Sequence, residues 1–136
     1  MRKWCCYILL LAVLFALPSC SMRTYLSTDF LPVLADETTG QQVLLSATVT
    51  ETESGKSVML TESDLSGLLL NLENMECTRG KTDSGEPVLY RVSFTLAGGE
   101  AEEWLIYNKV AFSVGGYRYS SIRGSIDLFW FARLFS

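Results

Sequence analysis

The sequence contains no histidine among its 136 residues. Catalytic sites that use an imidazole as general base, such as Ser-His-Asp and Cys-His arrangements, are therefore excluded. Zinc centres usually need histidine or several cysteines, so we expect neither a metal nor a cofactor. A pH switch built on histidine, the side chain whose ordinary pKa lies nearest neutrality, is excluded as well.

Cysteine is scarce and unevenly placed. Cys5, Cys6 and Cys20 fall within the first twenty residues, and Cys77 is the only other one. If the leading segment is removed and Cys20 carries lipid, no intramolecular disulfide can form, and the fold must depend on its core. We expect Cys77 to be a small buried hydrophobic residue on a strand. The alternative is a reactive thiol, but there is no histidine to activate it.

Basic residues are also in short supply, with 11 Lys and Arg against 15 Asp and Glu. Arg2 and Lys3 lie in the segment that we expect to be removed, which leaves nine basic residues against the same 15 acidic ones and a net charge of −6. Nucleic-acid binding needs clustered Lys and Arg for the phosphates. The sequence therefore predicts no nucleic-acid partner.

The amino-terminal segment has the layout of a secretory signal peptide. Arg2 and Lys3 give a positive start, residues 7–17 are an apolar run, and Pro18 and Ser19 follow. A permanent membrane span is the alternative, but it needs about 20 apolar residues. The short run favours a signal peptide.

The end of this segment, Leu17-Pro18-Ser19-Cys20, resembles the lipobox of bacterial lipoproteins, although Pro18 departs from the usual small residue. The resemblance implies cleavage before Cys20 and a lipid thioether on its sulfur. The protein would then be held on the extracytoplasmic face of the cell membrane. The alternative is an ordinary signal peptide followed by a chance cysteine.

These features predict a signal peptide at 1–19, a tether and membrane-proximal segment at 20–40, and one domain at 41–136. The remaining 117 residues are enough for one modest core and not for two domains. Part of the 20–40 segment is apolar, so we expect it to lie on the domain or near the lipid headgroups.

Alternating apolar residues predict strands, with the clearest pattern at Val88–Leu96. A leucine stripe after Thr61, the expected helix cap, predicts an amphipathic helix. Ser125–Phe135 is typical of a short second helix, with Ser125 as its expected cap. We expect an α+β fold in which one amphipathic helix covers an antiparallel sheet of about five or six strands.

Several segments between residues 43 and 136 resemble a group of small lipoproteins of Gram-positive bacteria. The resemblance implies secretion and a compact α+β fold, and it implies no activity because none is attached to the group. The similar segments are Thr52–Thr61, Leu65–Leu72, Cys77–Lys81, Leu89–Phe94 and Gly115–Tyr119.

Two acidic groups are candidate sites. Glu100, Glu102 and Glu103 include the paired carboxylates that glycoside hydrolysis requires, but they adjoin a Gly-Gly turn, which favours an exposed hairpin tip. Asp83 and Glu86 could bind calcium, yet their spacing differs from that of an EF-hand loop. We expect both groups to be ordinary surface residues, and no residue is assigned a catalytic role.

Four aromatic residues are candidates for a recognition surface: Trp104, Tyr107, Tyr117 and Tyr119. Tyr and Trp are enriched at binding hot spots, although aromatic residues on strands are mostly core. The expected function is non-enzymatic binding of an envelope protein, a peptide or a small ligand. The alternative is a carboxylate-based hydrolase of the cell envelope.

We predict that Cys20→Ala abolishes lipidation and leaves the protein as an uncleaved precursor or a released form. The reason is that no other thiol occupies the lipobox position. Labelling of cells with a fatty-acid analogue measures the effect. Equal labelling of the wild type and the variant would contradict the lipobox interpretation.

Overall fold

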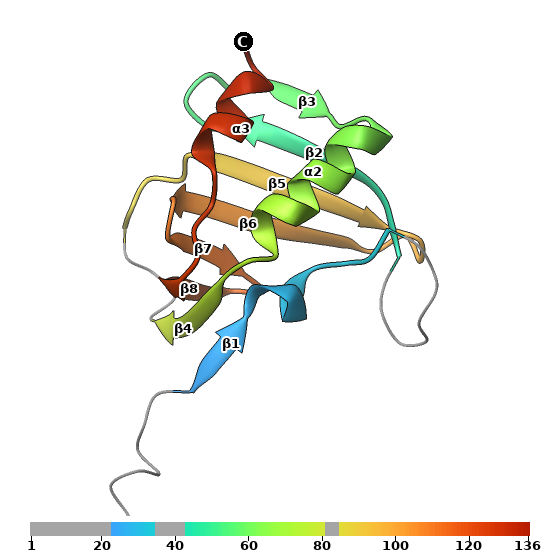
Figure 1. Ribbon diagram of the computed structural model, residues 1–136. Helices are drawn as coiled ribbons and strands as arrows, with labels where there is room; N and C mark the ends of the chain where they lie inside the picture. Colours follow the sequence, from blue (N-terminus) through green and yellow to red (C-terminus); the bar gives the residue numbers. More distant parts are fainter. Residues whose placement is uncertain (1–22, 35–42, 81–84) are drawn as a thin grey trace, which may run out of the picture.

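The alternating segments pair into one antiparallel sheet, and two helices lie on one of its faces (Figure 1). The computed structural model describes residues 23–34, 43–80 and 85–136. Within them, eight strands follow the order β1-β4-β8-β7-β6-β5-β2-β3. Their bounds are β1 Thr24–Leu26, β2 Leu44–Glu51, β3 Ser57–Met59, β4 Glu76–Gly80, β5 Tyr90–Leu96, β6 Ala101–Asn108, β7 Ala111–Val114 and β8 Tyr117–Arg123.

The alternation along β5 separates the two faces of the sheet. Val92, Phe94 and Leu96 are buried on the helix side, whereas Arg91 and Thr95 are exposed. Successive side chains of a strand point to opposite faces, so the period of two predicts this division. The clearest strand signal in the sequence is thereby confirmed.

The opposite face of the sheet is polar. Thr48, Ser93 and Glu103 are direct neighbours across β2, β5 and β6 on this face, and none of them is buried. An antiparallel sheet commonly packs one face on the core and leaves the other polar. The hydrophobic core therefore lies only between the sheet and the helices.

Helix α2 (Glu62–Leu72) supplies the predicted apolar stripe. Leu65, Leu68 and Leu72 are buried against the sheet. Thr61 occupies the N-cap position, but its hydroxyl donates to the Asp64 carboxylate at 3.1 Å instead of accepting from a backbone N–H. The predicted helix and its core face are confirmed, and the predicted capping bond is absent.

Helix α3 (Leu128–Arg133) lies on the same face as α2 (Figure 1). It begins after Asp127, whose carboxylate accepts from the N–H groups of Phe129 at 3.0 Å and Trp130 at 3.4 Å. The expectation that Ser125 caps this helix is therefore wrong, because Asp127 occupies the N-cap position. Asp127 is the stronger cap because its ionised carboxylate satisfies two N–H groups and complements the helix dipole.

Among the described residues the sheet has eight strands, more than the five or six that were expected, and two helices cover it instead of one. The two helices share the cover, and the amino-terminal segment assigned to the tether contributes β1, which pairs with β4. The 3₁₀ helix η2 (Ser27–Phe30) follows β1. A strand of three residues is too short to show a period, and its partner lies some fifty residues away in the chain, so the pattern gave no sign of it.

Ser27 fastens this amino-terminal segment to the domain. Its N–H donates to the Met75 carbonyl at 2.9 Å, and its hydroxyl accepts from the Met75 N–H at 3.1 Å. Both residues are buried. A buried pair of reciprocal hydrogen bonds satisfies groups that would otherwise lose water without replacement, so β1 and η2 are integral to the fold.

We predict that Leu68→Ala lowers the free energy of unfolding by about 2–5 kcal/mol, the usual cost of removing a buried leucine side chain. Leu68 is fully buried, whereas its neighbour Leu69 is only partly buried. Leu70→Ala on the exposed side of the same helix is the matched control and should change stability by less than about 0.5 kcal/mol. Denaturant unfolding of both variants measures the effect. Equal losses in the free energy of unfolding would contradict this packing.

Candidate functional site

The four predicted recognition residues do not form one surface. Trp104 and Tyr119 are buried in the core. Tyr107 lies on the polar face of the sheet, where its hydroxyl is 2.7 Å from that of Ser113. Tyr117 is 46% exposed and lies on the helix side near the edge of the sheet.

Strand geometry explains this separation. Trp104 and Tyr107 are three residues apart on β6, so their side chains point to opposite faces. Tyr117 and Tyr119 share a face of β8, but Tyr119 lies one step further into the sheet, where its ring stacks at 5.5 Å on that of Phe112. The four aromatic residues predicted to form one recognition surface are therefore divided between the core and two different surfaces.

The acidic cluster beside the β5–β6 turn is also divided. Glu100 and Glu103 are exposed as expected, and Glu103 pairs with Arg91 across the strands at 3.5 Å. Glu102 is only partly exposed, since it shares the face of the buried Trp104, and this burial raises the pKa of its carboxyl. The expectation of an ordinary, fully solvated carboxylate is therefore wrong for Glu102.

Glu86 is part of an ion pair on the polar face. Its carboxylate accepts from the Arg118 guanidinium at 2.6 Å and from the Asn108 amide at 2.9 Å. The Arg118 contact is the main cause of a lowered pKa at Glu86. Asp83, its proposed calcium-binding partner, lies outside the described residues. No group of three or more potential metal ligands occurs in the described part of the chain.

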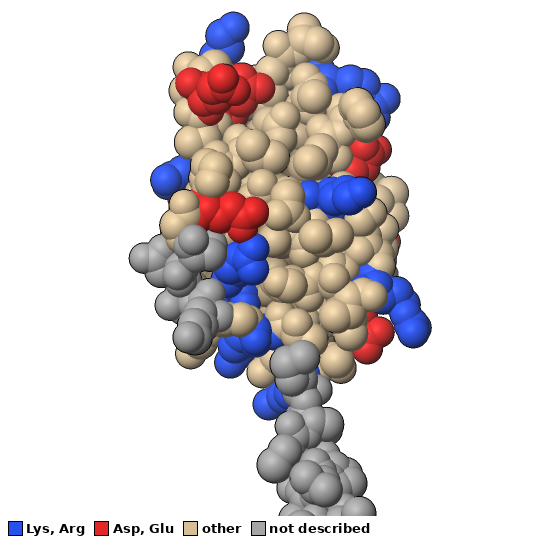
Figure 2. Space-filling view, turned by 90° about the vertical axis from the view of Figure 1, so that its left-hand side faces the viewer, with Lys and Arg blue, Asp and Glu red and all other residues tan. Residues whose placement is uncertain are grey.

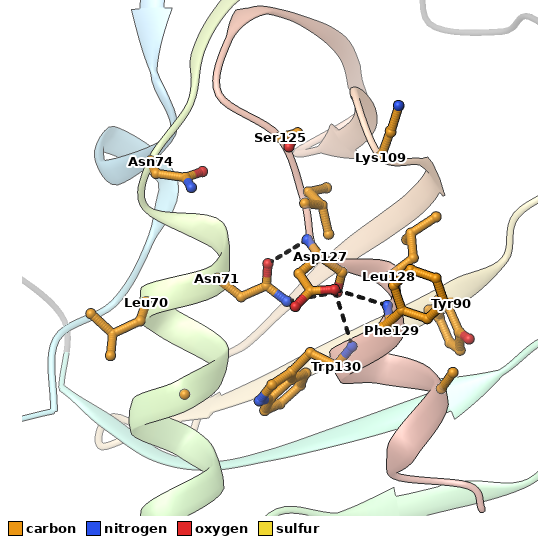
Figure 3. A pocket seen from close by; sticks show the side chains of 13 residues that line it. Leu70, Asn71, Asn74, Tyr90, Lys109, Ser125, Asp127, Leu128, Phe129 and Trp130 are labelled. Atoms are coloured by element: carbon orange, nitrogen blue, oxygen red, sulfur yellow. Dashed lines mark hydrogen bonds between the residues drawn. The ribbon is translucent and has the colours of Figure 1, made fainter.

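A groove lies between α2 and α3 (Figure 3). Its volume is about 960 Å³. Asn71 and Asp127 join its two walls, because the Asn71 amide donates to the Asp127 carbonyl at 3.0 Å and accepts from the Asp127 N–H at 2.7 Å. This pair fixes α3 beside α2 and so determines the width of the groove.

The rim of the groove is unusually apolar for a solvent-facing surface. Phe129 is 82% exposed, Leu70 is 62% exposed, and the Trp130 indole lines the wall near Gly67. Exposed apolar side chains are common singly, and a group of them around a concave site is typical of binding surfaces.

Two charged residues line this groove. One of them, Asp127, is engaged as the cap of α3. Lys109 stands on the rim and has no ion-pair partner among the described residues. The groove therefore offers an apolar surface with one available cation.

Three consecutive aromatic residues in the sequence are a signal for this groove. Phe129, Trp130 and Phe131 are consecutive in a helix of six residues. Side chains that follow one another in a helix diverge by about 100°, so the three rings cannot all face the core. Phe131 is fully buried, Trp130 is partly buried against the core, and Phe129 is left exposed.

The two remaining cysteine predictions have different outcomes. Cys20 lies outside the described residues, so its lipidation stays a prediction. Cys77 is buried on β4, as expected, and burial raises the pKa of its thiol to about 11. A thiol with this pKa is almost entirely protonated at neutral pH and is a poor nucleophile.

Neither helix of the described residues is long and apolar enough to span a bilayer. Comparison of the chain with protein-family models, curated proteins and solved structures found no match.

We predict opposite effects on stability at neutral pH for two conservative substitutions. Because the pKa of Glu102 is raised in the folded protein, its charge opposes folding as the pH rises above the ordinary range of a carboxyl. Glu102→Gln should therefore raise the melting temperature at pH 7. The pKa of Glu86 is lowered, so its stabilising effect is present at pH 7 and is lost as the pH falls. Glu86→Gln should lower the melting temperature.

Thermal melting at pH 7 and at about pH 3, below the ordinary carboxyl pKa, tests this prediction. The difference in melting temperature between each variant and the wild type should shrink at the lower pH, where each carboxyl is mostly protonated in the unfolded chain. Glu53→Gln, at an exposed position of the β2–β3 turn, is the control and should have little effect. A Glu102→Gln variant that melts below the wild type at pH 7 would contradict the assignment.

Proposed function

We propose that the protein is a lipid-anchored, extracytoplasmic binding domain whose groove between α2 and α3 takes an apolar peptide segment. The observation that carries this proposal is the exposure of Phe129 at the rim of an open groove. A side chain of this size in water costs free energy, and a partner that covers it recovers about 25 cal/mol per Å² of buried apolar area.

An open groove favours a peptide over an enclosed small molecule. Pockets for small molecules generally surround most of their ligand, whereas Phe129 and Leu70 project from a surface that is largely open to solvent. Helix-lined grooves of this kind bind segments through a few apolar anchors. Lys109 adds a preference for an acidic residue or a terminal carboxylate in the bound peptide.

The hydrolase alternative has weaker support. Two catalytic carboxylates must converge on one substrate, but Glu102 and Glu103 are consecutive on β6 and so point to opposite faces of the sheet. Glu103 is also paired with Arg91. The raised pKa of Glu102 follows from burial alone.

Selection from a random peptide library tests the proposed function. The immobilised protein should enrich peptides with apolar anchors and an acidic residue. Phe129→Ser should weaken the binding of these peptides at least tenfold, which corresponds to the loss of a large apolar anchor. Lys109→Gln should reduce the preference for the acidic residue.

Met59→Ser is the matched control, because Met59 is an equally exposed apolar residue on β3, on the polar face of the sheet. It should leave peptide binding unchanged. The groove is excluded as the binding site if no shared motif emerges, or if the selected peptides bind Phe129→Ser as tightly as the wild type.

A further inference from the structure

The edge of the sheet formed by β1, β4 and β8 has a charge opposite to that of the whole chain. These three strands contain three arginines and one glutamate, and Arg23 directly precedes β1. Figure 2 shows several basic side chains close together in the lower part of this face, below an acidic group, while other basic and acidic side chains are scattered over the rest of it. The three strands therefore carry a local excess of positive charge although the net charge of the chain is negative.

Two of these arginines are not neutralised. Arg118 pairs with Glu86, and Arg123 lies 4.0 Å from Glu76. Arg23 and Arg79 have no ion-pair partner among the described residues. Both are exposed, so their charges are available to an anionic surface.

Tyrosine rings hold these two charges at the edge. The Arg79 guanidinium lies 4.0 Å from the ring centroid of Tyr117 and 4.6 Å from that of Tyr25, and it donates to the Tyr119 hydroxyl at 3.2 Å. The Arg23 guanidinium lies 5.2 Å from the Tyr25 ring. Tyrosine and arginine side chains of this kind combine an apolar body with a polar end, which suits the boundary between lipid headgroups and acyl chains.

The same edge exposes aliphatic side chains. Leu26 on β1 is 54% exposed and Ile122 on β8 is 60% exposed. Single exposed aliphatic residues are ordinary. Leu26 follows Tyr25 on β1, so it points to the opposite face of the sheet from Tyr25 and Arg79. Aliphatic and basic side chains therefore lie on the two sides of the β1 edge.

The length of the chain before β1 determines which surface this edge meets. Cys20 precedes Thr24 by four residues, so the two Cα atoms can be at most about 14 Å apart, even in a fully extended chain. A lipid on Cys20 would therefore keep Thr24 within about two Debye lengths of the headgroups, since the Debye length is about 8 Å at physiological salt.

We propose that the edge formed by β1, β4 and β8 docks on the anionic headgroups of the bilayer and orients the anchored domain. Arg23 and Arg79 contact the headgroups together with Tyr25 and Tyr117. Leu26 enters the interface from the opposite face of β1, and Ile122 on β8 is covered as well. The proposal rests on the lipid anchor at Cys20 that forms part of the proposed function. It adds that the anchored domain has one preferred orientation, which depends on the charge of the lipids.

Labelling of single cysteines in the full lipidated protein tests the orientation. The protein is added to preformed vesicles of phosphatidylcholine alone, or of equal parts phosphatidylcholine and phosphatidylglycerol. The accessibility of Ile122→Cys to a water-soluble maleimide is then compared with that of Met59→Cys on the opposite edge strand, β3. Cys77 is buried and should not react with the maleimide, and labelling of the wild-type protein checks this.

Ile122→Cys should react several-fold more slowly on the anionic vesicles than on phosphatidylcholine, and Met59→Cys should react equally on both. One arginine near an anionic membrane contributes a factor of about five to binding, so Arg23→Gln or Arg79→Gln alone should nearly abolish this several-fold difference. Arg79→Lys should largely retain it. Arg133→Gln, on α3, is the control and should have no effect.

Three outcomes would overturn the proposal. Equal reactivity of Ile122→Cys on the two vesicle types would show that headgroup charge does not orient the domain, and so would a difference that persists in about 1 M salt, where the Debye length is about 3 Å. If the wild-type protein sediments with neither vesicle type, the lipid anchor itself fails, and this proposal fails with it. Sedimentation with both types combined with equal labelling would leave the anchor intact and exclude only the docking.

Discussion

The contact between Trp130 and Gly67 determines how two short helices share one face of a wide sheet. A Cβ atom at Gly67 would lie 3.1 Å from the indole Nε1 and 3.4 Å from Cζ2, so any larger residue would push the ring aside. Glycine lowers helix propensity by about 1 kcal/mol relative to alanine. The close approach of α3 gives a physical reason for its presence in the middle of α2.

Because α2 and α3 lie together, they leave part of the sheet for other residues to cover. The β1–β4–β8 side has no α-helix of its own among the described elements, and aromatic rings cover it instead. Phe30 from η2 lies 4.6 Å from the Tyr119 ring and 6.2 Å from the Tyr25 ring, measured between centroids. The tyrosines that hold Arg79 are therefore part of the packing of this edge, and the exposed charges rest on a rigid support.

The local patterns were enough to predict the elements that depend on neighbours in the chain. The alternation through Val92 and Phe94 and the leucine stripe of α2 both follow from a single side that faces the core. Features set by distant pairings were not predictable in this way. The strand β1 exists because Tyr25 pairs with Cys77, and the groove exists because Asn71 bonds to the backbone of Asp127. Neither partner can be identified from the local sequence.

The two proposed surfaces are compatible because they lie on different parts of the domain. The helix α3, which forms one wall of the groove, and the strand β1 lie toward opposite ends of the molecule (Figure 1). A domain that rests on the bilayer through β1 would hold Phe129, on α3, away from the headgroups, within reach of a peptide in the aqueous space. Docking would also keep the acidic residues of the β2–β3 turn, such as Glu53, away from the anionic surface. The local excess of positive charge on β1, β4 and β8 and the position of α3 thus favour the same orientation.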